Sequence, residues 1–208
     1  QATSGDIYYD RIAIQDHLRQ VRPKIGIVFQ NSVLDEALSV KDNLSIQAGL
    51  YKHISQERID EVIALTSLTG ILKQPVSQLS GGQKRRVDIA VSVLHQPEIL
   101  FLDEPTTGLD IQTRLAIWKV LQNMQKKEAM TIVLTTHYLE ETNVADNVYI
   151  INGGEIIANG SAKELIYRYT QEILTIESGD LSSICDTLGL KDEQLPLSLP
   201  CPNAQTAI

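Results

Sequence analysis

An apolar segment of this 208-residue chain ends in two adjacent carboxylates, an arrangement that can bind a metal ion and activate water. Residues 99–102 (ILFL) are directly followed by Asp103 and Glu104. Mg²⁺ prefers oxygen ligands and keeps several waters, so one carboxylate plus phosphate oxygens is a typical set of ligands for it. We expect Asp103 to contact such an ion. Glu104, just past the strand, can face a water molecule and act as a general base.

A serine followed by two glycines indicates a helix start that can bind an anion. Ser80, Gly81 and Gly82 precede Gln83, and residues 81–94 have helical periodicity. Glycines let the backbone approach a ligand, and the free N–H groups of a helix N-terminus favour phosphate. The helix dipole adds about 0.3–1 kcal/mol. A Ser-Gly-Gly turn before a helix is common, so this motif predicts a phosphate site only together with the others.

Polar side chains follow three predicted strands at the point where each strand ends. The strands cover residues 24–30, 98–103 and 131–136, and Gln30 and His137 end the first and the last of them. Ligands of open parallel sheets bind beyond the carboxyl ends of the strands. We therefore expect Gln30, His137 and the two carboxylates to share one site, although a polar strand end alone needs no functional explanation.

The remaining elements predict an α/β fold in which helices pack on a mostly parallel sheet. Capping boxes are expected at Ser39 with Asp42 and at Ser161 with Glu164. Asn152-Gly153-Gly154 predicts a hairpin turn. Helices are expected at 55–68, 81–94, 138–145 and 181–188, and strands at 148–151, 155–158 and 172–178, besides a hairpin at 7–14. A helix at 111–127 is expected to bury a stripe made of Ile111, Leu115, Trp118, Leu121 and Met124.

Composition excludes several classes of protein. The net charge of −8 argues against a nucleic-acid-binding protein held by its overall charge. No apolar run approaches the roughly 18–20 residues needed to cross a bilayer, and no signal peptide opens the chain. Cys185 and Cys201 have no metal-ligand spacing, and a reducing compartment is the default expectation. From Lys191 the sequence is polar and proline-rich, and we expect it to be loosely held.

Taken together, these motifs resemble the nucleotide-binding domain of ATP-binding cassette (ABC) proteins. Residues 79–83 (LSGGQ) match the signature, 98–104 match Walker B, and 107–110 (TGLD) match the D-loop. Gln30 matches the Q-loop glutamine and His137 the switch histidine. The segments TTGLD and TTHYLEE are similar to those of bacterial drug- and antibiotic-export cassettes. The resemblance covers residues 1–169, with a helical lobe at about 39–97, and leaves 170–208 as a partly flexible C-terminal extension.

This resemblance implies a P-loop NTPase-like α/β fold with a mostly parallel sheet, an inserted helical lobe and a small antiparallel β portion. It also implies ATP and Mg²⁺ as cofactors, with Asp103 and Gln30 at the metal, Glu104 as catalytic base and His137 at the γ-phosphate. Two cassettes, identical or different, would pair head to tail. The in-trans contacts to ATP would come from Ser80, Gly81, Gly82, Gln83 and Asp110.

The resemblance further implies an integral-membrane permease as partner, contacted by the helical lobe and especially by residues 31–38. The protein would then be cytoplasmic and peripheral on the inner face of the cell membrane, and would couple ATP hydrolysis to transport, with export expected. Nucleic acid is not an expected partner.

The sequence departs from the family in one respect: no G-x-x-x-x-G-K-[ST] loop occurs in the 208 residues. Residues 1–7 match the segment that normally follows this loop, so we expect an N-terminally truncated domain that is inactive alone. The alternative function is a non-catalytic module that only complements a partner cassette or binds the permease. A soluble cassette of translation or DNA repair is disfavoured, because positions 31–78 hold no heptads and no cysteines.

Overall fold

The computed structural model describes residues 4–169, 172–176 and 197–201, and it divides the chain into two compact units, 1–137 and 138–208. The predicted border between a cassette domain and an extension at residue 169 stays a prediction.

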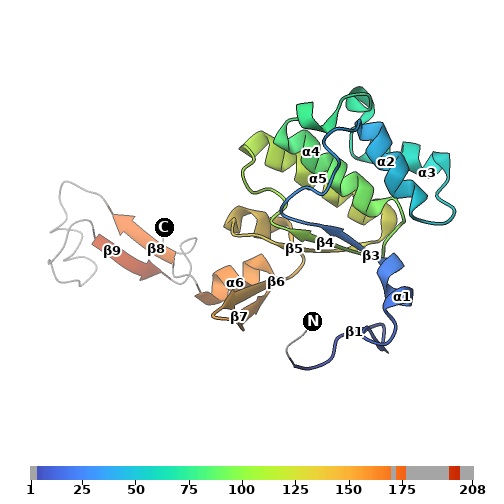
Figure 1. The fold of residues 1–208 in the computed structure, drawn as a ribbon. Coiled ribbons are helices and arrows are strands. Elements are labelled where there is room, and N and C mark those ends of the chain that lie inside the picture. Colours follow the sequence, from blue (N-terminus) through green and yellow to red (C-terminus); the bar gives the residue numbers. More distant parts are fainter. Residues whose placement is uncertain (1–3, 170–171, 177–196, 202–208) are drawn as a thin grey trace. The chain divides into compact units, whose positions relative to one another are not determined.

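The first unit is built on a parallel sheet of three strands. These are β3 (Ile25–Val28), β4 (Ile99–Asp103) and β5 (Thr131–Thr135), in the order β3-β4-β5 (Figure 1). Ile27 pairs with Phe101, and Phe101 pairs with Val133, so these three residues occupy equivalent positions in the register of the sheet. Their carboxyl ends therefore lie at one edge of the sheet, as the sequence predicts.

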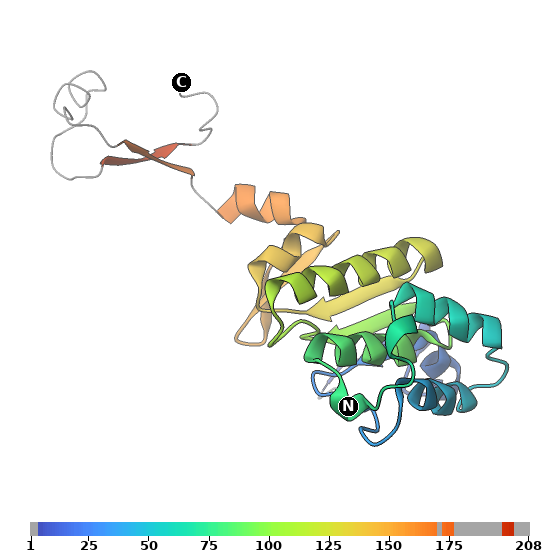
Figure 2. The ribbon, with the colours of Figure 1, turned by 90° about the horizontal axis from the view of Figure 1, so that it is seen from above.

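Helices cover one face of this sheet. Figures 1 and 2 show α4 (Gly81–Val93) and α5 (Ile111–Glu128) running across it. Val28, Leu100, Leu102, Ile89 and Ile117 are buried in the resulting core. The other helical elements of this unit are α1 (Leu18–Val21), η1 (Arg22–Lys24), α2 (Val40–Gly49), α3 (Gln56–Leu65), η2 (Thr69–Ile71) and η3 (Val76–Gln78).

The local signals read from the sequence are present in this unit. Ser39 accepts a hydrogen bond from the amide of Asp42, whose carboxylate accepts from the amide of Ser39, so the capping box of α2 is confirmed. The hairpin at 7–14 pairs β1 (Tyr8–Tyr9) with β2 (Ile12–Ala13). Its turn residues Asp10 and Arg11 have φ of 46° and 66°, as a two-residue hairpin turn of this kind requires.

The predicted apolar stripe of α5 is partly wrong. Leu121 and Met124 are buried as expected, but Ile111 and Leu115 are exposed, and the buried face is completed by Ile117 and Val120. The reason is that Thr113, Ile117, Val120 and Met124 share one side of the helix at 3.6 residues per turn, and this side packs on α4 and the core. Ile111 and Leu115 lie on a different side of the helix, which is exposed.

The opposite face of the sheet carries a row of partly exposed apolar side chains. Ile27, Phe101 and Val133 occupy paired positions and are 50%, 39% and 44% exposed. Parallel sheets are normally covered on both faces. The exposure of these apolar side chains therefore indicates that this face is a packing surface for another element.

The second unit contains an antiparallel hairpin of β6 (Val148–Asn152) and β7 (Glu155–Gly160), with Gly153 and Gly154 at positive φ in the predicted turn. The helix expected at 138–145 is present as a 3-10 helix, η4 (Leu139–Val144). The capping box of Ser161 and Glu164 begins α6 (Ala162–Tyr169).

The chain beyond Lys191 includes β9 (Leu197–Cys201), which pairs antiparallel with β8 (Glu172–Ile176). Pro200 is compatible with this pairing, because each strand of a two-stranded sheet has an unpaired edge. The expectation that this part of the chain is loosely held stays a prediction. The helix expected at 181–188 lies outside the described residues. In the described part of the chain, no helix combines the length and hydropathy that crossing a membrane requires.

Candidate functional site

Glu104 is the centre of a polar cluster at the carboxyl edge of the sheet. The Gln30 amide Nε2 donates to its Oε2 at 3.3 Å, and Nδ1 of His137 lies 3.7 Å from its Oε1. The hydroxyl of Thr107 also donates to Oε2, at 3.0 Å. The three strand ends named from the sequence thus meet around one half-buried carboxylate.

Thr135 bonds both to the carboxylate of Asp103 and to the backbone amide of Glu104, and the sequence analysis assigned it no role. Because β4 and β5 pair in register at Asp103 and Thr135, the Thr135 hydroxyl donates to Oδ1 of Asp103 at 2.7 Å. The Thr135 hydroxyl oxygen in turn accepts from the backbone amide of Glu104 at 3.0 Å. Glu104 has a φ of 43°, so the chain leaves the strand direction immediately after Asp103. The threonines of TTGLD and TTH were the available signal for Thr107 and Thr135.

The oxygen donors at this edge fit Mg²⁺ only as part of a larger ligand set. Asp103 is exposed and offers a carboxylate, and Gln30 offers an amide oxygen. Within the described ranges, no group of three or more His, Cys, Asp or Glu residues is arranged to hold a metal ion. An ion here would take its remaining ligands from water and phosphate, which is the usual preference of Mg²⁺.

The signature segment forms the capped start of α4. Ser80 accepts from the amide of Gln83 at 3.3 Å, and the Gln83 side chain accepts from the amide of Ser80 at 2.9 Å. A Cβ on Gly82 would lie 2.1 Å from Cγ2 of Thr113, whereas one on Gly81 would lie 3.3 Å from Leu109. Gly82 is therefore required for the contact between α4 and α5, while Gly81 leaves the exposed end of the helix free of a side chain.

Replacing Gly82 by alanine should destabilise the fold by about 1–3 kcal/mol, because the added methyl group overlaps Thr113. Gly81→Ala, one residue earlier in the same helix, should be close to neutral. Adding Thr113→Ser should restore most of the loss, since serine lacks the methyl group in the way. Urea unfolding of the four proteins measures this, and equal losses for Gly81→Ala and Gly82→Ala would contradict it.

Asp110 is the N-cap of α5. Its carboxylate accepts from the Thr113 amide at 3.0 Å and from the Thr113 hydroxyl at 2.6 Å. These bonds, first from the hydroxyl and then from the amide, lower the pKa of the Asp110 carboxyl. Because Thr113 also touches Gly82, the D-loop and the signature are packed together within one chain.

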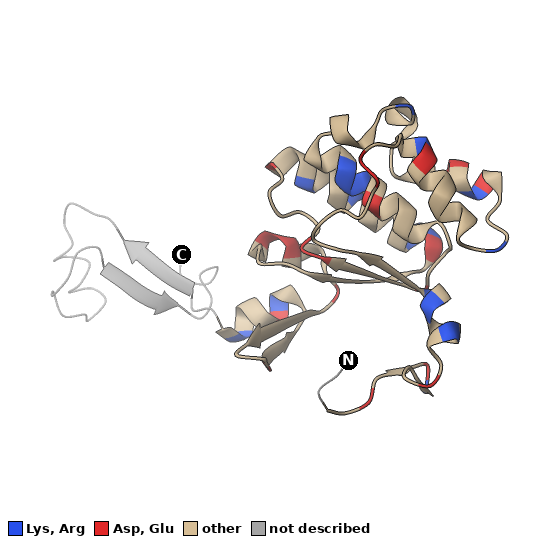
Figure 3. Ribbon diagram, in the orientation of Figure 1, with Lys and Arg blue, Asp and Glu red and all other residues tan. Residues whose placement is uncertain are grey.

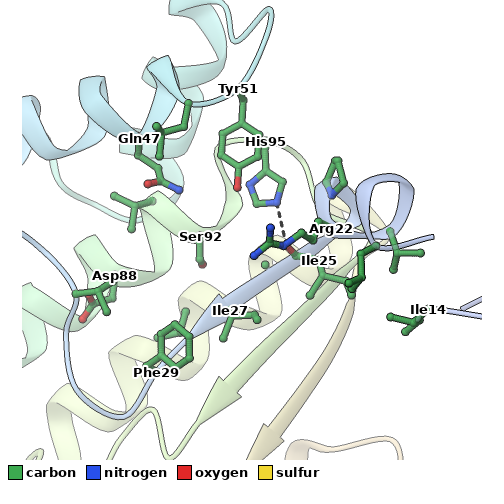
Figure 4. A pocket seen from close by; sticks show the side chains of 18 of the residues that line it. Ile14, Arg22, Ile25, Ile27, Phe29, Gln47, Tyr51, Asp88, Ser92 and His95 are labelled. Carbon is green, nitrogen blue, oxygen red and sulfur yellow. Dashed lines mark hydrogen bonds between the residues drawn. The ribbon is translucent and has the colours of Figure 1, made fainter. Parts of the chain in front are cut away.

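A cavity of about 550 Å³ lies beside β3, between α1, α2 and α4, and the sequence analysis did not predict it. Its wall includes Phe29, Val33 and the stacked rings of Tyr51 and His95, whose centroids are 4.3 Å apart (Figure 4). Nε2 of His95 donates to the carbonyl of Ile25 at 3.1 Å. Burial lowers the pKa of this imidazole, so the ring is neutral near pH 7.

The parallel sheet, the strand-edge cluster and the capped glycine helix together define a nucleotide-binding cassette. Residues 1–107 match the ABC transporter family, and the chain belongs to that family. The doxorubicin resistance ATP-binding protein DrrA of Mycobacterium tuberculosis is 40% identical over 176 residues, which are 81% of this chain and 53% of the relative. The methionine import ATP-binding protein MetN 1 of Acinetobacter baylyi is 36% identical over 174 residues, which are 80% of this chain and 49% of the relative.

A solved structure has the same fold. It is a dimeric post-hydrolysis state of the ATP-binding cassette MJ0796 bound to ADP and Pi, with a TM-score of 0.67 and 28% identity, and the match covers 77% of this chain and 74% of that chain. The P-loop NTPase-like α/β fold predicted from the sequence is thereby confirmed. This chain spans about half the length of the curated relatives it matches.

Proposed function

We propose that this chain is the ATP-hydrolysing subunit of an ABC transporter and that it drives export through a membrane permease. The observation that carries the proposal is the convergence of Gln30, Glu104 and His137 at the edge where Asp103 ends β4. Export is supported by the drug-resistance relative. The methionine import protein is almost as similar to this chain, at 36% identity against 40%. Membership of the family therefore does not by itself indicate the direction of transport.

In this proposal each side chain of the cluster has a distinct task. Glu104 accepts the proton of the attacking water, while Gln30 and Thr107 hold its carboxylate in place. His137 donates to the terminal phosphate. Asp103, oriented by Thr135, holds Mg²⁺, which supplies neutralisation of phosphate charge when bound.

The signature would act on the ATP of a second cassette. Ser80 and Gly81 are exposed at the N-terminus of a 13-residue helix, where amide groups and the helix dipole favour phosphate. We propose that two cassettes, identical or different, pair head to tail with Gln83 and Asp110 positioning this surface. The dimeric structure of the cassette MJ0796 with ADP and Pi supports the pairing of two cassettes.

The partner in the membrane would bind at the cavity beside β3. The first residues of the segment 31–38 line this cavity, and Val33 and Leu50 expose apolar side chains there. We propose that an apolar segment of the permease occupies it, which would place the protein on the cytoplasmic face of the membrane.

A second candidate function is a non-catalytic module that complements a partner cassette. It is favoured by the exposed signature surface of Ser80 and Gly81, which would act on a nucleotide held by another cassette. Mg²⁺-dependent ATP hydrolysis by the purified gene product that carries these residues would support the first function. Hydrolysis that appears only with an added partner cassette would support the second.

Ser80→Arg tests the proposed role of the signature. The bulky cation should block closure of the cassette dimer and lower ATP hydrolysis by at least about tenfold, while ATP binding to a single subunit is retained. Size-exclusion chromatography with ATP and a fluorescent-nucleotide titration measure the two properties. Equal loss of both, or loss of neither, would argue against a role across the dimer.

A further inference from the structure

The loop that follows Gln30 is held by buried polar contacts from α4. Arg85 is only 8% exposed, and its guanidinium donates from Nη1 to the carbonyl of Phe29 at 2.6 Å and from Nη2 to that of Gln30 at 2.9 Å. The residue therefore binds the backbone on which the Gln30 side chain is mounted.

Two further contacts follow the same helix. The hydroxyl of Ser32 donates to Oδ1 of the buried Asp88 at 2.8 Å, and Lys84 pairs with Glu36 at 2.6 Å. Figure 3 shows the basic and acidic positions side by side on α4. The loop of residues 29–36, which we call the Gln30 loop, is thus attached to one helix near both of its ends.

The helix itself lies directly against the strand that precedes this loop. A Cβ on Gly26 of β3 would be 2.5 Å from the carbonyl oxygen of Ser92 of α4. The glycine permits this approach, so that the backbones of α4 and β3 meet directly at this point, while side chains of α4 hold the Gln30 loop. A displacement of α4 would move the Gln30 backbone with it.

The chemistry of Arg85 is better suited to orienting the backbone of the Gln30 loop than to stabilising the fold. Burial lowers the pKa of its guanidinium and raises that of the Asp88 carboxyl, which reflects the cost of removing two charges from water. A methionine or leucine would fill the volume without that cost. A rigid fork that donates to two consecutive carbonyls is what only an arginine supplies.

We propose that Arg85 is a positioning residue that fixes the backbone of Gln30, so that its amide reaches Glu104, and that it joins the signature helix and the Gln30 loop into one moving body. The proposal rests on the proposed function, since it takes hydrolysis at Glu104 as the reaction served. It predicts that a change at the signature end of α4 reaches Gln30 through Arg85.

The test is a double-mutant cycle in the gene product that carries these residues. Arg85→Met should lower kcat for ATP hydrolysis about tenfold with little change in KM, and Arg85→Lys should recover part of the rate because it keeps one charged donor. If Arg85 acts through Gln30, then Arg85→Met should cause no additional loss in a Gln30→Ala protein. Multiplicative losses in the double variant would overturn the proposal.

Hydrogen exchange supplies a second readout that needs no hydrolysis. Arg85→Met should accelerate amide exchange across 29–36 by at least about tenfold and leave the amides of 8–13 unchanged. Arg168→Met, an exposed arginine on α6, is the matched control and should change neither exchange nor rate. Unchanged exchange in the Gln30 loop would overturn the proposal. If Glu104→Gln and Gln30→Ala both leave hydrolysis intact, the proposed function fails, and the positioning role fails with it.

Discussion

Replacing Glu104 by glutamine should lower ATP hydrolysis by roughly 10²–10⁴-fold while ATP binding and dimer formation persist. Glutamine has nearly the same shape and can still accept from Gln30 and Thr107, but it cannot take a proton from water. The change therefore removes one chemical step and leaves the surrounding geometry in place. The result should be a protein that binds ATP and stays dimeric because the nucleotide is not consumed.

Single-turnover hydrolysis and size-exclusion chromatography with ATP measure the two consequences separately. Glu57→Gln, at an exposed first-turn position of α3 outside the cluster, is the matched control and should hydrolyse ATP at the wild-type rate. Turnover by Glu104→Gln near the wild-type rate would show that another group is the base. Loss of binding together with turnover would show that Glu104 holds the nucleotide instead.

The sequence predicts the edge of the sheet well because strand ends are local features. An apolar run with a polar terminus at Gln30, Asp103 or His137 specifies both the strand and its functional end, and parallel pairing then brings the ends together. The predicted capping boxes at Ser39 and Ser161 are equally local, since donor and acceptor lie three residues apart.

What the sequence does not supply depends on contacts between distant segments. Thr135 is part of the cluster only because β4 and β5 pair at Asp103. Likewise, Arg85 reaches the backbone of the Gln30 loop only because α4 lies against that loop. The error in α5 has the same cause: the contact of its Thr113 side with Gly82 of α4 selects which side of the helix is buried, and helical periodicity alone assigned Ile111 to the wrong face.

Removing the guanidinium of Arg58 should cost about 3–5 kcal/mol of folding free energy. Arg58 and Glu128 are 8% and 11% exposed, and Nη1 and Nη2 donate to the two carboxylate oxygens at 2.7 and 2.9 Å. Nη2 and Nε also donate to the carbonyls of Val93 and Leu94, at the end of α4. One side chain therefore connects α3, α4 and α5, and Arg58→Met would leave both a buried charge and two carbonyls without these donors.

Urea unfolding measures the loss, and Lys127→Met is the matched control because its pair with Glu61 is exposed and should contribute less than about 1 kcal/mol. A second variant separates the cost of an unpaired charge from the value of the pair. In Arg58→Met with Glu128→Leu, the stranded carboxylate is gone, and apolar replacements of a buried pair are often neutral. This double variant should be more stable than Arg58→Met alone. If it is not, the carbonyls of α4, and not the Glu128 carboxylate, are the groups that need Arg58.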